Sequence, residues 1–251
     1  MKFDLDGKIA LITGSSKGIG FAIAKALKDE GCIVALNSRN NNNLVSATDQ
    51  IPGSIGLLGD VSDPEAAKRI VGEVVKKFGR LDILVCNAGN SQSVSPGSET
   101  YDEWQRIFSL NFWTATNCIE AAANALISSQ GNIICISSIC GVEVIPGAPI
   151  TYSVAKSALN AYVRGIARPL GNKGVRIYAI TPGNINFEGS VWSKKINHNE
   201  SAVKDMLKQN VSLERLGNCD DVARLAVYLA SSNSQFVTGS VWNIDGGQVR
   251  S

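Results

Sequence analysis

The sequence predicts an α/β fold, in which helices cover both faces of a doubly wound parallel sheet of about seven strands. Short apolar, β-branched segments alternate with longer segments whose apolar residues recur at helical spacing. The expected strands are apolar almost throughout, which indicates that both of their faces are buried. No linker rich in proline, glycine or serine interrupts the 251 residues, so we expect a single domain over 1–251.

Three expected strands and two helices fill the first third of the chain. Segment 8–14 (KIALITG) is a strand, and Ile19, Ile23 and Leu27 then lie on one helical stripe. Segments 32–37 (CIVALN) and 54–60 (SIGLLGD) are the next two strands, and the asparagines at 40–43 form a polar loop. Asp63 caps a helix over 63–79 that has Pro64 in its first turn.

The remaining segments continue the alternation. Strands are expected at 81–89 (LDILVCNAG), 131–138 (GNIICISS), 175–183 (VRIYAITPG) and 239–247 (GSVWNIDGG). Helices are expected at about 101–126, from about 151 onward and at 220–231. Residues 184–215 are polar, lack clear periodicity and follow a strand end, where such folds bind ligands. We therefore expect 184–215 to be a substrate-binding loop.

The composition argues against several classes of function. With 24 Lys and Arg against 22 Asp and Glu, the net charge of +2 is too small to favour nucleic acid or a membrane as partner. The first residues, MKFDLDGKIALITG, are typical of neither a signal peptide nor a transmembrane helix, so we expect a cytoplasmic protein. His198 is the only histidine, so we expect neither a histidine triad nor a metal site. The six cysteines lack framework spacing and are expected to be buried free thiols.

A glycine-rich turn follows the first expected strand. In TGSSKGIG, Gly14, Gly18 and Gly20 allow a tight turn, close approach of a phosphate and close packing of helix on strand. The N–H groups at the start of the next helix then offer an anion a favourable dipole. This context predicts a dinucleotide-binding site, and a purely structural turn is the alternative. The spacing G-x-x-x-G-x-G differs from the G-x-G-x-x-G of the common Rossmann fingerprint.

Five motifs that span nearly the whole chain carry a family resemblance. TGSSKGIG, NAG at 87–89, ISS ending at Ser138, Tyr152-x-x-x-Lys156 and TPG at 181–183 occur in the order found in classical short-chain dehydrogenases/reductases. The segment TGSVWNIDGG is similar to that family's usual ending. The nearest general resemblance is to 3-oxoacyl-[acyl-carrier-protein] reductases. The resemblance implies a Rossmann-type domain, a nicotinamide cofactor and an oxidoreductase that acts on a CH–OH group.

The end of the second expected strand predicts which nicotinamide is bound. An NAD enzyme usually has a carboxylate there, and an NADP enzyme has a basic residue nearby. Here Ser38 and Arg39 follow the strand, and Lys17 lies in the glycine loop. A guanidinium can fork onto a 2′-phosphate through charge-assisted hydrogen bonds, each worth about 1.5–3 kcal/mol. We therefore expect NADP(H), and the alternative is that Arg39 and Lys17 are ordinary solvated charges.

The resemblance also implies which residues line the cofactor. Asp60 and Val61 would flank the adenine ring. Phe187 stands where the family pattern Pro-Gly-x-Ile-x-Thr has a threonine that contacts the carboxamide, so that hydroxyl is missing here. The full set implied is Gly14, Ser16, Lys17, Gly18, Ile19, Gly20, Ser38, Arg39, Asp60, Val61, Asn87, Ala88, Gly89, Tyr152, Lys156, Pro182, Gly183 and Ile185.

Tyr152 and Lys156 are four residues apart at the start of an expected helix, where they share one face at about 5–6 Å between Cβ atoms. Carbonyl reduction needs a general acid, and free tyrosine has a pKa of about 10. A cation about 4–5 Å away would stabilise the phenolate by about 3–4 kcal/mol at an effective dielectric of about 20. This spacing predicts that Lys156 lowers the pKa of Tyr152. The alternative is an ordinary pair on a helix surface.

The resemblance assigns a role to each of four residues. Tyr152 would be the proton donor or acceptor, and Lys156 would also bind the nicotinamide ribose. Ser138 would hold the substrate carbonyl, and it is preferred over its neighbour Ser137 because S-x-x-G to Gly141 fits the family. Asn111, in SLNFW, would anchor a water that relays protons to Lys156.

The substrate is left open by the sequence. A 3-oxoacyl thioester on an acidic carrier protein, a ketosugar, a steroid-like alcohol and another small ketone are the candidates. The segment ISSQGN before the fifth strand lacks the basic residues that carrier-dependent reductases often have there. A different class of function is a redox sensor or assembly protein that binds NADP(H) without turnover. The resemblance further implies a homotetramer that acts on a small molecule.

Overall fold

The computed structural model describes residues 2–250 and contains a parallel seven-stranded sheet of order β3-β2-β1-β4-β5-β6-β9. Its strands are β1 (Ile9–Ile12), β2 (Ile33–Ser38), β3 (Ile55–Leu58), β4 (Ile83–Cys86), β5 (Asn132–Ile136), β6 (Arg176–Pro182) and β9 (Ser240–Ile244). Each of the seven coincides with a segment expected to be a strand. The predicted α/β architecture is therefore confirmed.

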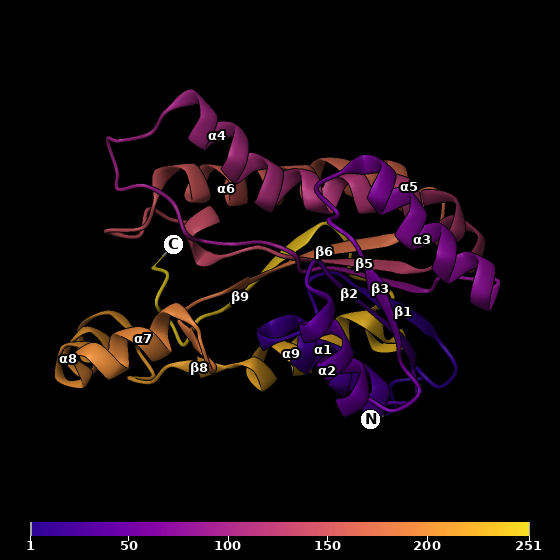
Figure 1. Cartoon of the computed structure of the whole chain (residues 1–251), viewed down its shortest axis with the longest axis horizontal. Coiled ribbons are helices and arrows are strands. Elements are labelled where there is room, and N and C mark those ends of the chain that lie inside the picture. The colour runs from indigo at the N-terminus through magenta and orange to yellow at the C-terminus, as the bar shows by residue number, and fades with distance from the viewer. Residues whose placement is uncertain (1, 251) are drawn as a thin grey trace.

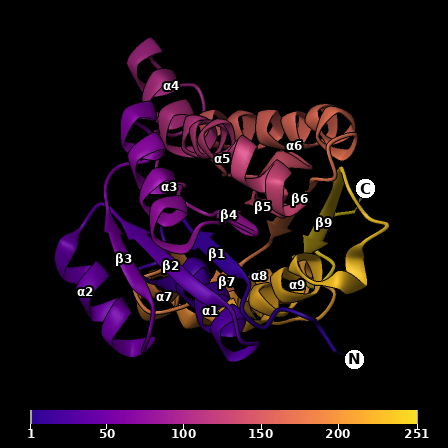
Figure 2. The ribbon, with the colours of Figure 1, turned by 90° about the vertical axis from the view of Figure 1, so that its right-hand side faces the viewer.

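Two layers of helices sandwich this sheet (Figures 1 and 2). One face is covered by α3 (Pro64–Phe78), α5 (Thr114–Ser129) and α6 (Ile150–Gly171), which share an apolar core with the sheet. The other face is covered by α1 (Gly18–Asp29), α2 (Asn41–Gln50) and α9 (Cys219–Ala230), which bury a second core. Because both faces are covered, the central strands β1, β4 and β5 are buried throughout, whereas the edge strands β3 and β9 are partly exposed.

The helix expected at about 101–126 is interrupted by a wider turn. It consists of α4 (Tyr101–Phe108), the π-helical turn η1 (Ser109–Trp113) and α5. A π turn leaves backbone carbonyls without their usual partners. Side chains supply partners here, since Asn111 Nδ2 donates to the Ile107 carbonyl at 3.1 Å and Thr114 Oγ1 donates to the Leu110 carbonyl at 3.1 Å. The interruption therefore places Asn111 at a specialised turn.

Residues 184–215 form a small helical lobe beyond one end of the sheet (Figure 1). The lobe contains β7 (Ile185–Asn186), α7 (Val191–His198) and α8 (Glu200–Asn210), and β7 pairs with β8 (Gly217–Asn218). Val203, Leu207 and Val211 make a small apolar cluster of their own, with Trp192 packed against it. The sequence pattern did not predict these two short helices.

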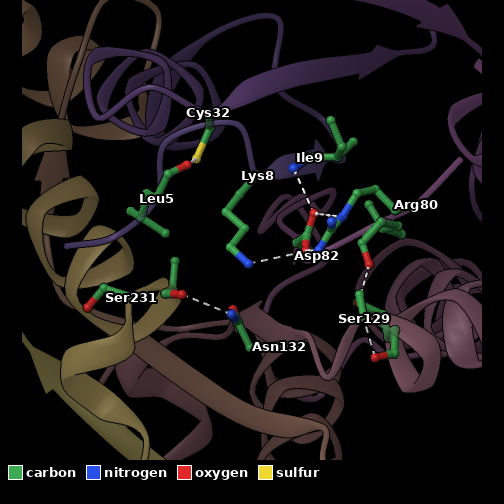
Figure 3. A network of polar contacts seen from close by, with 12 residues as sticks. Leu5, Lys8, Ile9, Cys32, Arg80, Asp82, Ser129, Asn132 and Ser231 are labelled. Atoms are coloured by element: carbon green, nitrogen blue, oxygen red, sulfur yellow. Dashed lines mark hydrogen bonds and ion pairs between the residues drawn. The ribbon is translucent and has the colours of Figure 1, made fainter. Parts of the chain in front are cut away.

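A polar network joins the amino ends of the central strands (Figure 3). Buried Asp82 precedes β4, and its carboxylate accepts hydrogen bonds from the backbone N–H of Ile9 and from Arg80, both at 2.9 Å. Lys8 Nζ lies 3.7 Å from the same carboxylate. The Ser129 hydroxyl donates to the Leu81 carbonyl at 2.6 Å. This network holds β1, β4 and the end of α5 together at the edge opposite the glycine loop.

The structure corrects the loop expected at asparagines 40–43. Asn41–Gln50 is the helix α2, and the Asn40 side chain caps it by accepting the backbone N–H of Asn43 at 3.0 Å. All six cysteines lie in the described range and are unpaired, with four of them buried. Among residues 2–250, no helix combines the length and apolar character that a membrane span requires.

Candidate active site

The glycine loop and the segment after β4 meet where the strand order reverses between β1 and β4. Gly14 and Gly18 have φ values of +59° and +60°, which favour glycine. A methyl group on Gly14 would lie 2.8 Å from the Ala88 Cα, so the loop packs directly on the NAG segment. Open α/β sheets bind their ligands at such a switch point.

Thr13 and Asn87 fix this contact by hydrogen bonds. The buried Thr13 hydroxyl accepts the backbone N–H groups of Asn87 and Ala88 at 3.0 and 3.1 Å. The Asn87 amide donates to the carbonyls of Thr13 and Gly14 at 3.0 and 2.9 Å. Asn87 also lies where a side chain on Gly20 would have to fit. These contacts show why this position of the helix requires glycine.

Asn37 ties the glycine loop to the second and third strands. Its backbone N–H donates to the Ser15 hydroxyl at 3.1 Å, and its side-chain amide donates to the carbonyls of Leu57 and Gly59, both at 3.0 Å. The backbone N–H of Gly14 donates to the Asn37 Oδ1 at 3.4 Å. Asn37 is therefore a scaffold for the loop, a role that the sequence analysis did not assign.

Arg39 and Asp60, two of the residues expected to contact the adenosine half of the cofactor, lie side by side. Arg39 Nη1 is 3.2 Å from Asp60 Oδ2, and Ser38 is buried with its hydroxyl accepting the backbone N–H of Asn40. Partial burial of Asp60 raises its pKa, but hydrogen bonds from Ser62 and Arg39 outweigh this and hold it below its usual range. An arginine carries five N–H donors, so the pair with Asp60 leaves donors for another anion.

The start of α1 fits a phosphate group. The helix begins at Gly18, and its N-cap residue Lys17 makes no side-chain cap. Helix N–H groups that lack a side-chain partner are a ready site for an anion. Ser16 precedes Lys17, and Ile19 follows Gly18 in the same turn. The arrangement of this loop is therefore compatible with the diphosphate of a dinucleotide.

Tyr152, Lys156 and Ser138 converge at the carboxyl end of β5. Lys156 is buried in α6, and its Nζ donates to the Ile136 carbonyl at 2.9 Å and lies 5.8 Å from the centre of the Tyr152 ring. Ser138 is also buried, and its hydroxyl accepts the backbone N–H of Cys140 at 3.2 Å. The structure thus brings together three of the four residues expected to be catalytic.

Burial shifts the pKa values of both members of the pair. Burial raises the pKa of Tyr152 above its ordinary value, and a hydrogen bond with the Ser138 hydroxyl opposes that shift. Burial also lowers the pKa of Lys156 to about 8. The direction for Tyr152 is opposite to the one expected from the spacing of the pair, because the cost of removing a phenolate from water is the largest contribution to its pKa.

The turn after β5 is fastened to the backbone of α6. The Ser137 hydroxyl donates to the Lys156 carbonyl at 3.3 Å, and the Asn160 amide donates to the Gly141 carbonyl at 2.9 Å. A methyl group on Gly141 would lie 2.6 Å from the backbone carbon of Lys156. Ser137 is therefore engaged with the helix backbone, whereas the hydroxyl of its neighbour Ser138 accepts the backbone N–H of Cys140.

Asn111 lies close to Lys156 on the other side of Gly89. A methyl group on Gly89 would be 2.9 Å from Asn111 Oδ1 and 3.5 Å from Lys156 Nζ. The Asn111 amide is reciprocally bonded to the backbone of Asn90, at 2.9 Å to the carbonyl and 3.1 Å from the N–H. Its expected role in anchoring a water stays a prediction.

The other expected cofactor residues lie around the same edge. Pro182 ends β6, and Gly183 packs so closely on Asp245 that a methyl group would lie 2.8 Å from its Cα. Ile185 is buried in β7, and buried Val61 has its carbonyl bonded to the Asn117 amide at 3.2 Å. A cavity of about 170 Å³ lies beside this region, lined by residues that include Asn184, Arg215, Arg224 and Asp245. None of the expected catalytic residues lines it.

Phe187 takes an unexpected place at the site. A methyl group on Gly18 would lie 2.8–2.9 Å from two atoms of the Phe187 ring, so the ring covers the glycine loop. The backbone N–H of Phe187 donates to the Ser190 hydroxyl at 3.3 Å. Residues 184–215 therefore contact the loop through an aromatic ring at the position where the family pattern has threonine.

The sequence analysis did not identify two hydroxyl groups near the site, those of Ser93 and Thr151. Ser93 and the fully buried Thr151 have their oxygens 2.6 Å apart, and Thr151 immediately precedes Tyr152. No motif marks Ser93, because its partner is 58 residues away. Only the position of Thr151 beside a catalytic candidate could have drawn attention to it.

Comparison with known proteins places these observations in a family. A family model described as Enoyl-(Acyl carrier protein) reductase matches residues 14–248. An uncharacterised oxidoreductase of Methylorubrum extorquens is 35% identical over 97% of this chain and 98% of its own length. A 3-oxoacyl-[acyl-carrier-protein] reductase of Thermotoga maritima is 29% identical over 98% of this chain and 99% of its own length.

A solved structure agrees closely with the whole fold. The L-sorbose reductase of Gluconobacter frateurii, complexed with NADPH and L-sorbose, matches with a TM-score of 0.93 at 27% identity and covers 100% of both chains. The motifs, the sheet order and these matches lead to one assignment. The chain belongs to the short-chain dehydrogenase/reductase family of oxidoreductases.

Proposed function

We propose that this protein is an NADP(H)-dependent oxidoreductase that interconverts a ketone and a secondary alcohol, with Tyr152 as general acid and base. The observation that carries the proposal is the convergence of Ser138, Tyr152 and Lys156 at the carboxyl end of β5, beside the glycine loop. When bound, the nicotinamide would supply the hydride or accept it. The side chains of this chain then have to hold the carbonyl and move one proton.

The raised pKa of Tyr152 keeps the phenol protonated at neutral pH, and it also makes the phenol a weaker acid than free tyrosine. The protonated phenol is the form that can act as an acid toward a carbonyl oxygen. Lys156, with its pKa lowered to about 8, remains mostly protonated at neutral pH and stabilises the phenolate that is left. The Ser138 hydroxyl would hold the same carbonyl oxygen, and Asn111 would anchor a water that returns a proton toward Lys156.

NADP(H) is favoured over NAD(H) by the residues after β2. Ser38 and Arg39 stand where a carboxylate would mark an NAD enzyme, and Arg39 keeps donors beyond its pair with Asp60. Lys17 adds a second positive charge at the N-cap of α1. The NADPH in the structure of the L-sorbose reductase supports the same choice. Arg39→Asp should reverse the preference for NADPH over NADH, measured as the ratio of the two Kd values.

We propose that the substrate is a 3-oxoacyl thioester or a ketosugar, the two classes that the names of the relatives suggest, or another small ketone. We propose that the single domain over 1–251 binds it beneath residues 184–215. We further propose a homotetramer, in which exposed apolar side chains such as Tyr101 of α4, Trp113 of η1 and Val154 of α6 would be covered. We also propose a cytoplasmic location.

The test is NADPH oxidation with acetoacetyl-CoA, L-sorbose and a small diketone, measured for the wild type and for Tyr152→Phe. Removing a general acid costs about 10²–10⁴-fold, so kcat should fall by that factor while the Kd for NADPH stays within about twofold. Tyr101→Phe, at an exposed tyrosine of α4, is the matched control and should behave as wild type. Undiminished turnover in Tyr152→Phe would refute the proposal. Binding of NADPH without turnover of the three compounds would favour a sensor.

A further inference from the structure

The segment Asn90–Ser93, here called the strap, connects Asn111 with Thr151, the residue that precedes Tyr152. At one end the backbone of Asn90 is bonded in both directions to the Asn111 amide, at 2.9 and 3.1 Å. At the other end the Ser93 hydroxyl is 2.6 Å from the Thr151 hydroxyl. Between them, Arg106 donates to the Gln92 carbonyl at 3.0 Å. The strap is therefore held at three points along four residues.

Glu103 gives the hydrogen bonds of the strap a fixed direction. Arg106 donates to its carboxylate through two nitrogens, at 2.8 and 2.7 Å, and the Ser93 hydroxyl lies 2.6 Å from it. Hydrogen bonds from Arg106 and then from Ser93 lower the pKa of Glu103 to about 2, so the group is a carboxylate and can only accept. Ser93 has one proton, which goes to Glu103. The Thr151 hydroxyl must then donate to Ser93.

The helix end that carries Tyr152 depends on this attachment. α6 begins at Ile150, and its N-cap residue Pro149 makes no side-chain hydrogen bond to the helix. The first turn of α6 also contains no acidic residue. Helix ends without a cap fray within the first turn. Thr151 lies in that first turn and is fully buried, and its hydroxyl bonds to a different part of the chain. The strap thus provides a tertiary restraint where a cap is missing.

We infer that Ser93 and Glu103 are positioning residues that, through Thr151, hold the first turn of α6 and so fix the Tyr152 hydroxyl relative to Ser138 and the bound carbonyl. The inference rests on the proposed function, since it gives Tyr152 the proton-transfer role. Neither Ser93 nor Glu103 touches the reacting atoms. Their removal should therefore lower the rate of the chemical step more than the affinity for cofactor, because a small misplacement of an acid costs rate rather than binding.

The test compares Thr151→Val, Ser93→Ala and Glu103→Gln with the conservative Thr151→Ser. The wild type is assayed with acetoacetyl-CoA and L-sorbose, and the faster substrate is used for all variants. We expect kcat to fall about tenfold or more in the first three variants, with the Kd for NADPH within twofold of wild type. Thr151→Ser keeps the donor and should restore kcat. Glu99→Gln, in the same connecting segment, is the control, because its carboxylate bonds to the backbone N–H of Gly97 and not to Ser93.

A second readout needs no substrate. Amide hydrogen exchange in the second turn of α6, whose N–H groups bond to carbonyls of the first turn, should be at least tenfold faster in Ser93→Ala than in wild type, whereas the second turn of α3, a helix capped by Asp63, should be unaffected. Unchanged exchange would overturn the inference whatever the substrate. If Thr151→Val and Glu103→Gln kept the wild-type kcat while Tyr152→Phe was inactive, this inference would be overturned and the proposed function would stand. Full activity in Tyr152→Phe would instead refute the proposed function, and the inference with it.

Discussion

Lys156 is a lysine buried in an interior that does not favour its charge, and this makes stability depend on pH. Its folded pKa is about 8, below its ordinary value of 10.5, because of burial. Between these values the unfolded chain binds more protons than the folded chain, so stability rises with pH there. The penalty for burying the charge is fully present below pH 8 and is lost as the pH rises toward 10.5.

Lys156→Met, which keeps the length of the side chain, isolates this effect. Between pH 7 and pH 10, the free energy of unfolding of the wild type should increase by roughly 2–3 kcal/mol relative to that of the variant. Urea denaturation of both proteins at several pH values measures the gap, and other titrating groups cancel because the two proteins share them. A gap that stays constant with pH would show that the folded pKa is not lowered.

Gly141 is a position where even one methyl group is too large. Its Cβ would lie 2.6–2.8 Å from backbone atoms of Lys156 and Ser157, and backbone atoms cannot rotate away. Gly141→Ala should therefore push the turn carrying Ser138 from α6, lower the free energy of unfolding by about 1–3 kcal/mol and lower kcat strongly. Denaturation and NADPH oxidation measure the two effects.

Gly165 provides the control for that substitution. It lies in the same helix, and a methyl group there would meet nothing within 4 Å. Gly165→Ala should raise stability by about 0.5–1 kcal/mol, because alanine loses less backbone entropy in a helix. If both variants lost stability equally, crowding at Gly141 would not be the cause.

At the scale of the elements, the sequence predicted the parts that repeat a pattern and missed those that depend on single contacts. The seven strands and the helices α1, α3, α6 and α9 follow from periodicity that a large core enforces. The helix α2 begins with residues of low helical propensity, and it forms because Asn40 caps it and Leu44 and Ala47 are buried. The polar residues at 40–43 made the helical spacing of Leu44 and Ala47 hard to recognise from the sequence.

The lobe over residues 184–215 shows the same limit. Its helices are short and bury only a few residues, so their periodicity is weak. The position of Phe187 against Gly18 arises from the path of the chain after β7, which no local pattern encodes. Among the candidate site residues, sequence motifs identified Ser138, Tyr152 and Lys156. The supporting contacts of Asn37, Ser93 and Thr151 join distant segments and required the fold.

Phe187 links this lobe to the glycine loop, which leads to a prediction about cofactor exchange. Because the ring covers Gly18, a dinucleotide has to displace it or slide beneath it. Phe187→Thr should raise the association rate of NADPH several-fold. The rate can be measured after rapid mixing from the energy transfer between tryptophan and bound NADPH. Phe236→Thr, at a fully exposed phenylalanine, is the matched control. An unchanged association rate in Phe187→Thr would show that the ring does not obstruct entry.

At the scale of the whole molecule, the carboxyl ends and the amino ends of the strands carry different groups of residues. The carboxyl edge carries the glycine loop and the catalytic candidates, and the amino edge carries the network around Asp82 (Figure 3). Topology explains this division, since a parallel sheet brings all its loops of one kind to one edge. The sequence predicted the functional edge from its motifs, but it gave no sign that Arg80 and Lys8 would meet at Asp82.

Asp82→Ala tests the division between the edges. The substitution leaves the N–H of Ile9 without its acceptor and removes the partner of Arg80, so stability should fall by about 2–3 kcal/mol. Arg80 and Lys8 are both partly exposed, which keeps the loss below that of a fully buried pair. The Kd for NADPH should be unchanged. Asp49→Ala on exposed α2 should alter neither quantity, and weaker NADPH binding in Asp82→Ala would contradict the separation.

The π turn at Ser109–Trp113 has a consequence for how this chain tolerates insertions and deletions. A π turn holds one residue more than an α turn, so deletion of a single residue there could close the helix into a regular α-helix. The segments before and after the deletion would keep nearly the same orientation, because a π turn absorbs its extra residue within a single turn. Glu103 would therefore still face Ser93, whereas the widened turn that the side chains of Asn111 and Thr114 now support would be lost. A one-residue deletion within 109–113 would thus change the surroundings of Asn111 and leave the fold in place.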